Sequence, residues 1–466
     1  MGDGDWFLKR YIRMKMEFTI ADKIIIQGAS GEFTSTVKAR LTFTNPKWVE
    51  NDRRGFWNGD TPKELKCFEQ SKKGLIIPRS FICHLIGMAK DQGIEYHLQD
   101  HRRTLPAKGD FSFHGQLKPF QKAAVKDILA HDFGILSAPT GSGKTCMALY
   151  VIAQRKQPVL IVVHTKELLN QWIDRVETFL GISAKEVGVI GNGKLSLGDQ
   201  ITVATAQTLY RCADEVKDHV GFLIVDECHR APSRTFTEAV TAFDSKFMLG
   251  LSATPWRRDK LSRFIYWYLG DVVHEVSKEN LLKTGDVLPV KVITRQTEFR
   301  TSLNPSEQYS RMLSELTQDT ARNRLIAWDV ATETRKDEGV CLVLSDRKAH
   351  CETMQDLLWR EHKIRPELLT GDIPKREREA IVARLNRGKV KILIATGQLI
   401  GEGFDCKQLN TLFLTTPIKF SGRVLQYLGR VLRPAPGKKK ARVYDYIDSH
   451  VAILEVAART RMKIYG

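Results

Sequence analysis

From Phe133 onward, short runs of apolar and β-branched residues alternate with longer stretches that have helical periodicity. A first group of runs comprises residues 134–137, 159–163, 201–204, 222–225 and 248–251, and a second group comprises 340–344, 392–395 and 411–415. Buried strands that alternate with helices are typical of a parallel sheet covered on both faces. The pattern therefore predicts an α/β fold class with two such domains in tandem.

The first hundred residues follow a different pattern. Residues 18–26 and 33–43 alternate between apolar and polar positions, and residues 45–60 are rich in turn-forming residues. This pattern predicts a separate small α+β domain before the two α/β domains. We expect the three domains at these bounds: 1–105, 106–284 and 285–466.

Basic residues outnumber acidic ones in this 466-residue chain, because 72 Lys and Arg against 54 Asp and Glu give a formal net charge of +18. Such a charge favours a polyanionic partner, although a solvated basic surface without a partner gives the same composition. The 42% hydrophobic and 27% charged residues are typical of a soluble globular protein. No apolar run approaches the roughly 20 residues that a membrane helix needs, so we expect no membrane partner.

The eight cysteines are scattered, without a CxxC pair or a His/Cys cluster at zinc-ligand spacing. We expect them to be reduced and mostly to pack in the interior. The first residues include basic side chains, but the apolar segment of a signal peptide does not follow them. Together these features predict a cytoplasmic protein.

A glycine-rich loop connects the apolar run 134–137 to a helical stretch. Its residues are Ala138, Pro139, Thr140, Gly141, Ser142, Gly143, Lys144 and Thr145. The backbone N–H groups of such a loop, together with the helix N-terminus behind it, bind phosphate oxygens. Lys144 is placed to reach the β- and γ-phosphates of a nucleoside triphosphate, and the Thr145 hydroxyl to ligate magnesium. Ala138 stands where the general pattern has glycine, but the Gly-x-Gly-Lys-Thr core is intact.

Two acidic residues follow the strand predicted at 222–225. Asp226 and Glu227 stand at its carboxyl end, where doubly wound sheets bind their ligands. We expect Asp226 to hold the magnesium ion and Glu227 to accept a proton from the attacking water. An acidic pair after a strand can also cap a helix, so this prediction depends on the phosphate-binding loop that precedes it.

Two arginines, Arg430 and Arg433, are three residues apart in a helical stretch that begins with Gln426. Side chains at this spacing share one face of a helix. If the two α/β domains face each other, both arginines can reach the γ-phosphate, as arginine fingers do in related nucleoside triphosphatases. The alternative is a basic helix that contacts solvent or a phosphate backbone.

With these elements in order, the chain resembles the superfamily 2 helicases from Leu117 to Arg433. The resemblance implies two RecA-like domains that hydrolyse ATP with Mg²⁺. It implies that Gln121 reads the adenine and that Gly403 and Asp405, in motif V, take part in the nucleotide site. Small hydroxyls and backbone amides at the strand ends would bind phosphates without reading bases. The residues concerned are Thr165, Lys166, Thr205, Gln207, Ser345, Thr370, Gly371 and Thr396.

Within that superfamily the chain is more similar to UvsW-type and XPB-like DNA translocases than to DEAD-box RNA helicases. Motif II reads Asp-Glu-Cys-His, and motif III, Ser252-Ala253-Thr254, is followed by Pro-Trp-Arg-Arg-Asp. The resemblance implies a DNA substrate, movement from 3′ to 5′, and remodelling of forks, R-loops or recombination intermediates. It also implies that the first domain recognises the substrate.

In that first domain, Trp48, Arg53 and Arg54 are the candidate nucleic-acid contacts. Basic residues interleaved with aromatic ones can contact phosphates while the rings stack on exposed bases. A tryptophan-anchored turn that packs against the motor explains the same residues equally well.

Three alternatives remain open. An RNA helicase would act on RNA or on an RNA–DNA hybrid. A motor subunit of a restriction or defence complex would depend on partner proteins for any nuclease activity. A nucleic-acid clamp with an inactive ATPase is disfavoured, because the residues that hydrolysis needs are all present, namely Lys144, Asp226, Glu227, Arg430 and Arg433.

Overall fold

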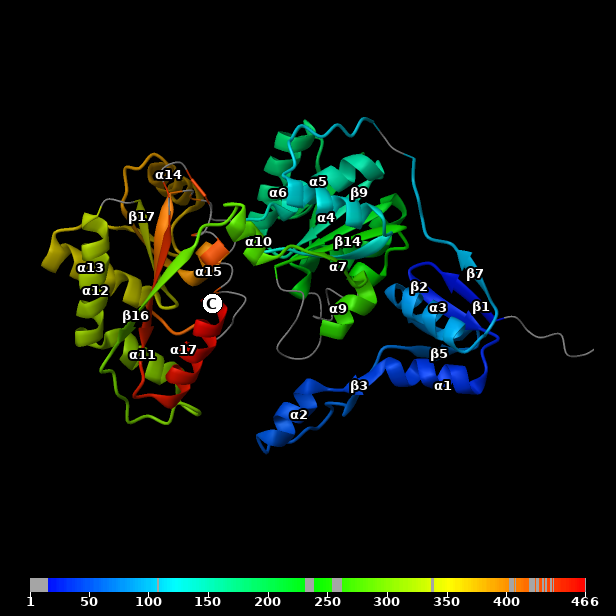
Figure 1. Ribbon diagram of the computed structural model, residues 1–466, viewed down its shortest axis with the longest axis horizontal. Coiled ribbons are helices and arrows are strands. Elements are labelled where there is room, and N and C mark those ends of the chain that lie inside the picture. The colour runs from blue at the N-terminus through cyan, green and yellow to red at the C-terminus, as the bar shows by residue number, and fades with distance from the viewer. Residues whose placement is uncertain are drawn as a thin grey trace, which may run out of the picture. The chain divides into compact units, whose positions relative to one another are not determined.

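The computed structural model describes residues 16–106, 109–230, 239–253, 262–336, 339–401, 406, 408–418, 424, 427–429, 431, 434–435, 438 and 440–465. These residues form two compact units. One consists of the described residues within Met1–Ser137 and Thr145–Glu275, and the other of those within Ala138–Lys144 and Val276–Gly466. Two largely parallel sheets and a smaller mixed sheet confirm the predicted fold class (Figure 1).

The smaller mixed sheet lies in the N-terminal domain and has the strand order β5-β6-β2-β1-β7. Its strands are β1 (Met16–Ile20), β2 (Lys23–Gln27), β5 (Glu69–Ser71), β6 (Gly74–Pro78) and β7 (Tyr96–Asp100). Helices α1 (Gly31–Arg40) and α3 (Ile82–Asp91), with the short 3-10 helix η1 (Arg79–Phe81), add buried side chains to its core. The N-terminal domain is therefore α+β, as predicted.

The alternation predicted for residues 33–43 is wrong, because most of this segment is the helix α1. Phe33, Val37 and Leu41 are fully buried and lie four residues apart. That spacing places them on one face of a helix, whereas a strand would need buried residues at every second position. Ser30 caps the helix, since its hydroxyl oxygen accepts a hydrogen bond from the Phe33 N–H at 3.1 Å.

Between α1 and β5 the chain forms a projection, residues 45–63, which we call the knob. The elements of the knob and of its base are β3 (Thr42–Thr44), α2 (Pro46–Arg53) and β4 (Glu64–Lys66). Asn45 closes the knob at its base, because its side chain accepts from the Lys47 N–H at 3.0 Å and donates to the Pro62 carbonyl at 2.9 Å. No residue of α2 is buried, so the knob has little core of its own.

The first RecA-like domain is built on eight strands among the described residues, in the order β11-β10-β12-β9-β13-β14-β8-β15. The strands are β8 (Phe133–Ser137), β9 (Val159–Val163), β10 (Gly188–Gly191), β11 (Lys194–Ser196), β12 (Ile201–Thr205), β13 (Phe222–Asp226), β14 (Phe247–Ser252) and β15 (Val272–Glu275). Only β10 and β11 pair antiparallel in this sheet as described. Every residue of β9, β12 and β13 is buried, as the continuous apolar runs predict.

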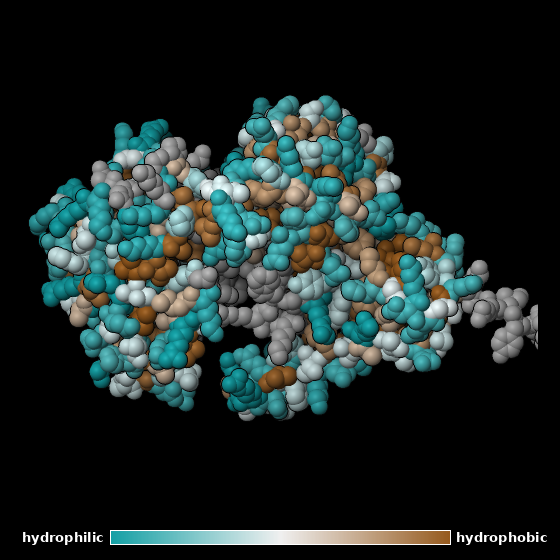
Figure 2. Space-filling view, in the orientation of Figure 1, coloured by the Kyte–Doolittle hydropathy of each residue, from teal (hydrophilic) through white to brown (hydrophobic). Residues whose placement is uncertain are grey.

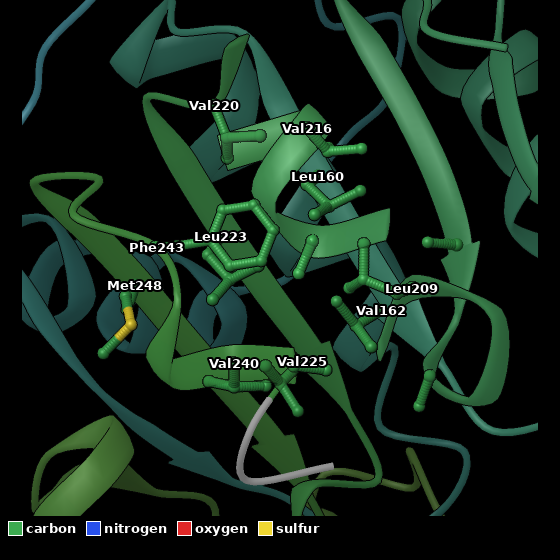
Figure 3. Packing of buried hydrophobic residues seen from close by; sticks show 14 of the residues in the cluster. Leu160, Val162, Leu209, Val216, Val220, Leu223, Val225, Val240, Phe243 and Met248 are labelled. Carbon is green, nitrogen blue, oxygen red and sulfur yellow. The ribbon is translucent and has the colours of Figure 1, made fainter. Parts of the chain in front are cut away.

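Helices pack against this sheet and supply the rest of its core (Figure 1). They are α4 (Pro119–Leu129), α5 (Lys144–Arg155), α6 (Lys166–Leu180), α7 (Ala206–Val216) and α9 (Ser262–Leu269), with the 3-10 helices η2 (Lys217–His219) and η3 (Cys228–Arg230). Figure 3 shows Leu160 of β9, Leu223 of β13, Leu209 and Val216 of α7, and Phe243 in one cluster. Because the central strands are largely apolar, their side chains pack the helices onto the sheet, and functional polar side chains collect at the strand ends.

The N-terminal domain packs firmly against the first RecA-like domain. Arg79 is buried, and its Nη1 donates to the carbonyl oxygen of Ser245 at 2.9 Å. At the base of the knob, the Phe43 ring contacts Phe264 and Trp267 of α9, with ring centroids 5.1 and 5.5 Å apart. The apolar cores of the two domains are thus continuous at α9.

The second RecA-like domain contains six described strands, all parallel, in the order β16-β21-β20-β17-β19-β18. They are β16 (Val290–Gln296), β17 (Val340–Ser345), β18 (Glu367–Leu369), β19 (Ile392–Thr396), β20 (Leu409–Leu414) and β21 (Ala441–Ile447). The helices of this unit are α10 (Lys278–Lys283), α11 (Tyr309–Gln318), α12 (Thr320–Arg335), α13 (Lys348–His362), α14 (Lys375–Asn386), α15 (Gly397–Gly401) and α17 (Ala452–Tyr465). The predicted domain bounds at 106 and 285 stay predictions.

Apolar side chains of α12 and α13 form one core with the central strands, and α11 packs with α17 in a second, smaller cluster. Within the part of the chain that the structure describes, no helix combines the length and the apolar character that crossing a membrane requires.

Candidate active site

The glycine-rich loop runs from the end of β8 to the start of α5. Gly141 and Gly143 have φ angles of 91° and 85°, which side chains other than glycine rarely adopt. This conformation turns successive backbone N–H groups toward one side, which suits a phosphate. The Lys144 ammonium donates to the Ala138 carbonyl at 3.0 Å, so it lies over the same loop. The hydroxyl of Thr140 is buried and forms no hydrogen bond among the described residues.

The acidic pair lies at the same edge of the sheet as this loop. Strand β14 separates β13 from β8, and the register aligns Asp226 with Leu251 and Leu251 with Leu136. The loop starts just after that row of residues. Because all three strands are parallel, Asp226 and Thr145 both stand at the carboxyl end of the sheet, where such folds bind nucleotides.

The carboxylate of Asp226 is buried and held from two directions. Its Oδ2 accepts a hydrogen bond from the indole Nε1–H of Trp172 at 2.8 Å, and its Oδ1 accepts from the Glu227 N–H at 2.9 Å. Trp172 belongs to α6 and is itself buried. The sequence marks Trp172 only as a core position, because Leu169, Trp172 and Val176 follow helical spacing. Its carboxylate partner is apparent only in the structure.

Glu227 has an unusual backbone and an unsatisfied side chain. Its φ of 49° is in the left-handed region, which is uncommon for a residue other than glycine and is often found at active sites. Its Oε2 is buried and forms no hydrogen bond among the described residues, although it lies 3.3 Å from Nδ1 of His229. A buried carboxylate oxygen that accepts no hydrogen bond within the described residues is suited to binding a water molecule.

His229 also connects motif II to the neighbouring strand, because its Nδ1 lies 3.1 Å from the hydroxyl of Ser252 at the end of β14. Both residues are buried. A movement of Ser252 therefore reaches Glu227 through one imidazole ring. Ser252 is the first residue of the predicted motif III, whose threonine lies outside the described residues.

The donor set at this edge fits a nucleoside triphosphate and a hard divalent cation. The loop supplies backbone N–H groups and the Lys144 ammonium, and Thr145 and Asp226 supply the oxygen ligands that Mg²⁺ prefers. Gln121, the predicted adenine reader, is buried in the first turn of α4, where its Oε1 accepts from the Lys118 N–H at 2.9 Å.

Predicted nucleic-acid residues of the first RecA-like domain lie at the ends of two paired strands. Thr205 aligns with Val163, the last residue of β9, so the segments after β9 and β12 are neighbours. Thr165 caps α6, accepting from the Leu168 N–H at 3.3 Å, and Thr205 occupies the same position at α7. The side chains of Lys166 and Gln207 are exposed. The structure thus brings these four residues to one edge.

In the second RecA-like domain, Ser345 and Thr396 are aligned at the ends of β17 and β19, and Thr370 follows β18. Gly371 is exposed and Thr396 half-buried, but Ser345 and Thr370 are buried. The Ser345 hydroxyl lies 3.0 Å from Nδ1 of His350 and accepts from the Arg347 N–H at 3.1 Å. Ser345 therefore supports the loop from within.

Two family models match consecutive segments of the sequence, one in each RecA-like domain. The res subunit of type III restriction enzymes matches residues 114–257, and the helicase conserved C-terminal domain matches residues 321–435. The chain is a superfamily 2 helicase. As such it is an ATP-dependent helicase or translocase, an enzyme that hydrolyses nucleoside triphosphates.

Three relatives of this superfamily 2 helicase cover most of its length. XPB2, a DNA 3′-5′ translocase of Sulfurisphaera tokodaii, is 28% identical over 74% of this chain and 84% of its own. The ATP-dependent DNA helicase UvsW of Enterobacteria phage T4 is 26% identical over 74% of this chain and 70% of its own. A protein of Acanthamoeba polyphaga mimivirus, named for an ATP-dependent RNA helicase, is 27% identical over 73% of this chain. That match spans 65% of the mimivirus protein, just under two thirds.

Several predicted residues of the helicase lie outside the described residues. They are Gln426, Arg430 and Arg433 of the helical stretch with the two predicted arginine fingers, and Gly403 and Asp405 of motif V. Their roles stay predictions, as do those of the other site residues.

The knob residues are described and differ in their surroundings. The Lys63 ammonium lies 5.2 Å from the centre of the Trp48 ring, and Arg54 forms an ion pair with Glu50 at 2.6 Å. Arg53 is exposed.

Proposed function

We propose that this superfamily 2 helicase is a DNA motor that moves from 3′ to 5′, depends on Mg²⁺ and remodels branched DNA. The observation that carries the proposal is the sheet edge where Asp226, Glu227 and the phosphate-binding loop stand together. Kinship with a DNA translocase and a DNA helicase supports the substrate and the direction.

At the nucleotide, each residue has one task. The loop amides and Lys144 bind the β- and γ-phosphates, and Thr145 and Asp226 would hold Mg²⁺, which neutralises the charge that develops during phosphoryl transfer. Glu227 orients water through its open Oε2 and accepts the proton. Arg430 and Arg433 would complete the site as arginine fingers, and Gln426, Gly403 and Asp405 would border it.

At the nucleic acid, the two sheet edges carry hydroxyls and amides suited to phosphates. In the first RecA-like domain these groups come from Thr165 and Gln207, and Lys166 adds an ammonium group. In the second they come from Gly371 and Thr396. Contacts of this type hold a strand irrespective of its sequence, as a motor that steps along DNA requires. The net charge of +18 adds a long-range attraction for a polyanion.

The cellular setting is also part of the proposal. All eight cysteines are free thiols, and six of them are buried. Free thiols favour a reducing compartment, so we place the protein in the cytoplasm. There it would act alone or with other proteins of a repair or defence complex.

Two other candidate functions have specific support. The name of the mimivirus relative favours RNA or an RNA–DNA hybrid. The match to the restriction res subunit favours the motor of a restriction complex, in which a nuclease comes from a partner. Two relatives that align with this chain over 385 and 360 residues are named for DNA, which makes DNA the first choice.

The deciding experiment measures the steady-state ATPase rate with single-stranded DNA, duplex DNA, a four-way junction and duplex RNA. Glu227→Gln serves as the blank because it keeps the size of the side chain and removes the base. Strongest stimulation by the junction supports the proposal. Preference for RNA overturns the DNA assignment. In a separate measurement, unwinding of partial duplexes with a 3′ or a 5′ tail reports the direction of movement.

A further inference from the structure

The tip of the knob carries the most exposed large apolar side chain among the described residues. Trp57 is 90% exposed, and its neighbour Phe56 is 59% exposed. Figure 2 shows a mainly hydrophilic surface over α2. A single exposed apolar residue needs no explanation, but two adjacent aromatic rings at the end of a projection are typical of a contact surface.

The exposed Trp57 ring is held in place by its own turn. Gly59 has a φ of +42°, and a Cβ at that position would lie 2.6 Å from Cζ3 of Trp57. The six-membered part of the indole therefore rests on the Gly59 backbone, in the space that a side chain would fill. This contact restricts the rotation of the ring, so little conformational entropy is lost when a ligand binds to it.

The charged neighbours of the ring suit a nucleic-acid strand. Arg53, at the end of α2, forms neither an ion pair nor a hydrogen bond among the described residues, so its guanidinium is available for a phosphate. Trp48 and Arg54 are already engaged with Lys63 and Glu50. The residues best placed to bind a ligand are thus Arg53 and Trp57, of which the sequence prediction included only the first.

The knob does not stand apart from the motor. Its base strand β3 places Phe43 against Phe264 and Trp267, and Phe43 is separated from the knob by a single residue. The Arg79 guanidinium joins the same N-terminal domain to Ser245, just before β14. The base of the knob is therefore fixed to the domain that carries motif II.

We propose that Trp57 is a stacking surface for an unpaired base at a DNA branch point, with Arg53 binding an adjacent phosphate. This inference rests on the proposed function and names the part of the substrate that the N-terminal domain recognises. Every base has a π face, so stacking on an aromatic ring tolerates any sequence but requires a base that is not enclosed in a duplex. The knob thus distinguishes branched from fully paired DNA.

The test compares the full-length chain with Trp57→Ala on two DNAs of equal length, a fork with single-stranded arms and a blunt duplex. Loss of one stacked base weakens binding by about 5- to 150-fold, and we expect this change in the Kd for the fork. The Kd for the blunt duplex should change less than two-fold. Trp57→Phe keeps a ring and should retain most of the affinity. Trp328→Ala, at a tryptophan of α12 that is 56% exposed, is the matched control.

A fluorescent base analogue at the branch gives a second measurement. Stacking on Trp57 should quench it in the unaltered protein and in Trp57→Phe, but not in Trp57→Ala. Equal loss of affinity for both DNAs, or unchanged affinity for the fork, overturns the inference. In the latter case a protein partner for the knob becomes the better explanation. Failure of the proposed function is seen separately, in the unaltered protein, as ATPase stimulation by RNA rather than by the junction.

Discussion

The two RecA-like domains differ in the partners of their buried carboxylates. In the first, the strands are apolar throughout, and the carboxylates stand at the sheet edge, where Oε2 of Glu227 has no hydrogen bond among the described residues. In the second, Asp445 and Asp448, in and just after the last strand, each accept hydrogen bonds from a buried arginine of the same domain. Removing one partner of such a buried pair is costly, whereas a buried carboxylate oxygen without a hydrogen bond can bind a water molecule.

The second domain provides two such pairs. Arg461 of α17 donates through Nη2 to Asp445 of β21 at 2.7 Å, and the Tyr465 hydroxyl donates to the same carboxylate at 2.7 Å. Arg322 of α12 donates to Asp448 through Nε at 2.8 Å. All these side chains are almost completely buried. They attach α17 and α12 to the carboxyl end of β21, which apolar packing alone would not orient.

The largest expected effect comes from Glu227→Gln. Removing the proton acceptor while keeping the shape should lower kcat for ATP about 10²- to 10⁴-fold. Stability should stay within about 0.5 kcal/mol, since the carboxylate has no partner to lose other than the contact with His229. Steady-state ATPase and thermal unfolding measure the two quantities. A variant that is as active as the unaltered protein would remove Glu227 from the mechanism.

Arg461→Met should instead affect stability. Among the described residues it leaves the buried Asp445 with only the Tyr465 hydroxyl as a side-chain hydrogen-bond partner. Breaking one side of a buried ion pair costs about 3 to 5 kcal/mol. Urea unfolding of the second domain measures the loss. Arg459→Met is the matched control, because its ion pair with Glu455 is exposed and should contribute less than about 1 kcal/mol. Equal losses of stability for the two substitutions would mean that the buried ion pair contributes no more than the exposed one. The structural role assigned to buried pairs in the second domain would then be wrong.

Trp172→Phe should have a smaller and more specific effect. It removes the N–H that holds Oδ2 of Asp226 but keeps an aromatic ring in the core. A hydrogen bond to a charged group contributes about 1.5 to 3 kcal/mol, so the Mg²⁺ concentration needed for half-maximal nucleotide binding should rise by roughly 10- to 150-fold. Binding of a non-hydrolysable ATP analogue at several Mg²⁺ concentrations measures this without catalysis.

The control for that experiment is Trp359→Phe, at a tryptophan of α13 that is 42% exposed. It should leave the Mg²⁺ dependence unchanged. If Trp172→Phe lowers the melting temperature but not the Mg²⁺ affinity, the indole only fills space, and Asp226 is oriented by its other contacts.

Sequence patterns predicted the central strands well, since residues buried on both faces leave a continuous apolar run. Strand β9 occupies the predicted residues 159–163, and β13 and β14 extend the prediction by one or two. In the two RecA-like domains, strands β10, β11, β15, β16, β18 and β21 were not predicted. The edge strands β15 and β16 are only partly buried and mix apolar with charged side chains, and the buried strand β21 contains Arg442 and Asp445 among its apolar residues. Residues 33–43 misled because threonines lie between the apolar residues of α1.

The candidate site divides in a similar way. The phosphate-binding loop and motif II depend on residues adjacent in sequence, so local chemistry was enough to predict them. The contact between Trp172 and Asp226 joins residues that are distant in the chain and depends on how α6 packs on the sheet. The exposure of Trp57 depends on the projection of the knob, which the composition of the segment does not reveal.

The smallest expected effect concerns pH and the second domain. His350 is enclosed, with Nδ1 3.0 Å from the Ser345 hydroxyl and Nε2 2.9 Å from Oδ1 of Asn323. Burial, with a minor contribution from the charge of Arg322, lowers the pKa of His350 to about 3. Above pH 6.5 the imidazole is neutral in both the folded and the unfolded chain. Below it only the unfolded chain takes up the proton, so stability falls as the pH falls toward 3.

Stability should therefore decrease by at most about 1.4 kcal/mol for each pH unit below 6.5. His350→Gln can still donate to Asn323 and accept from Ser345, so it should lose this dependence while costing little at pH 7.5. Urea unfolding of both proteins at pH 7.5, 6.5 and 5.5 isolates the contribution, because other titrating groups cancel in the difference. If the free energies of unfolding of the two proteins change in parallel with pH, the imidazole is protonated within the folded protein. The second domain would then tolerate an unpaired buried charge, as the first domain does at Glu227.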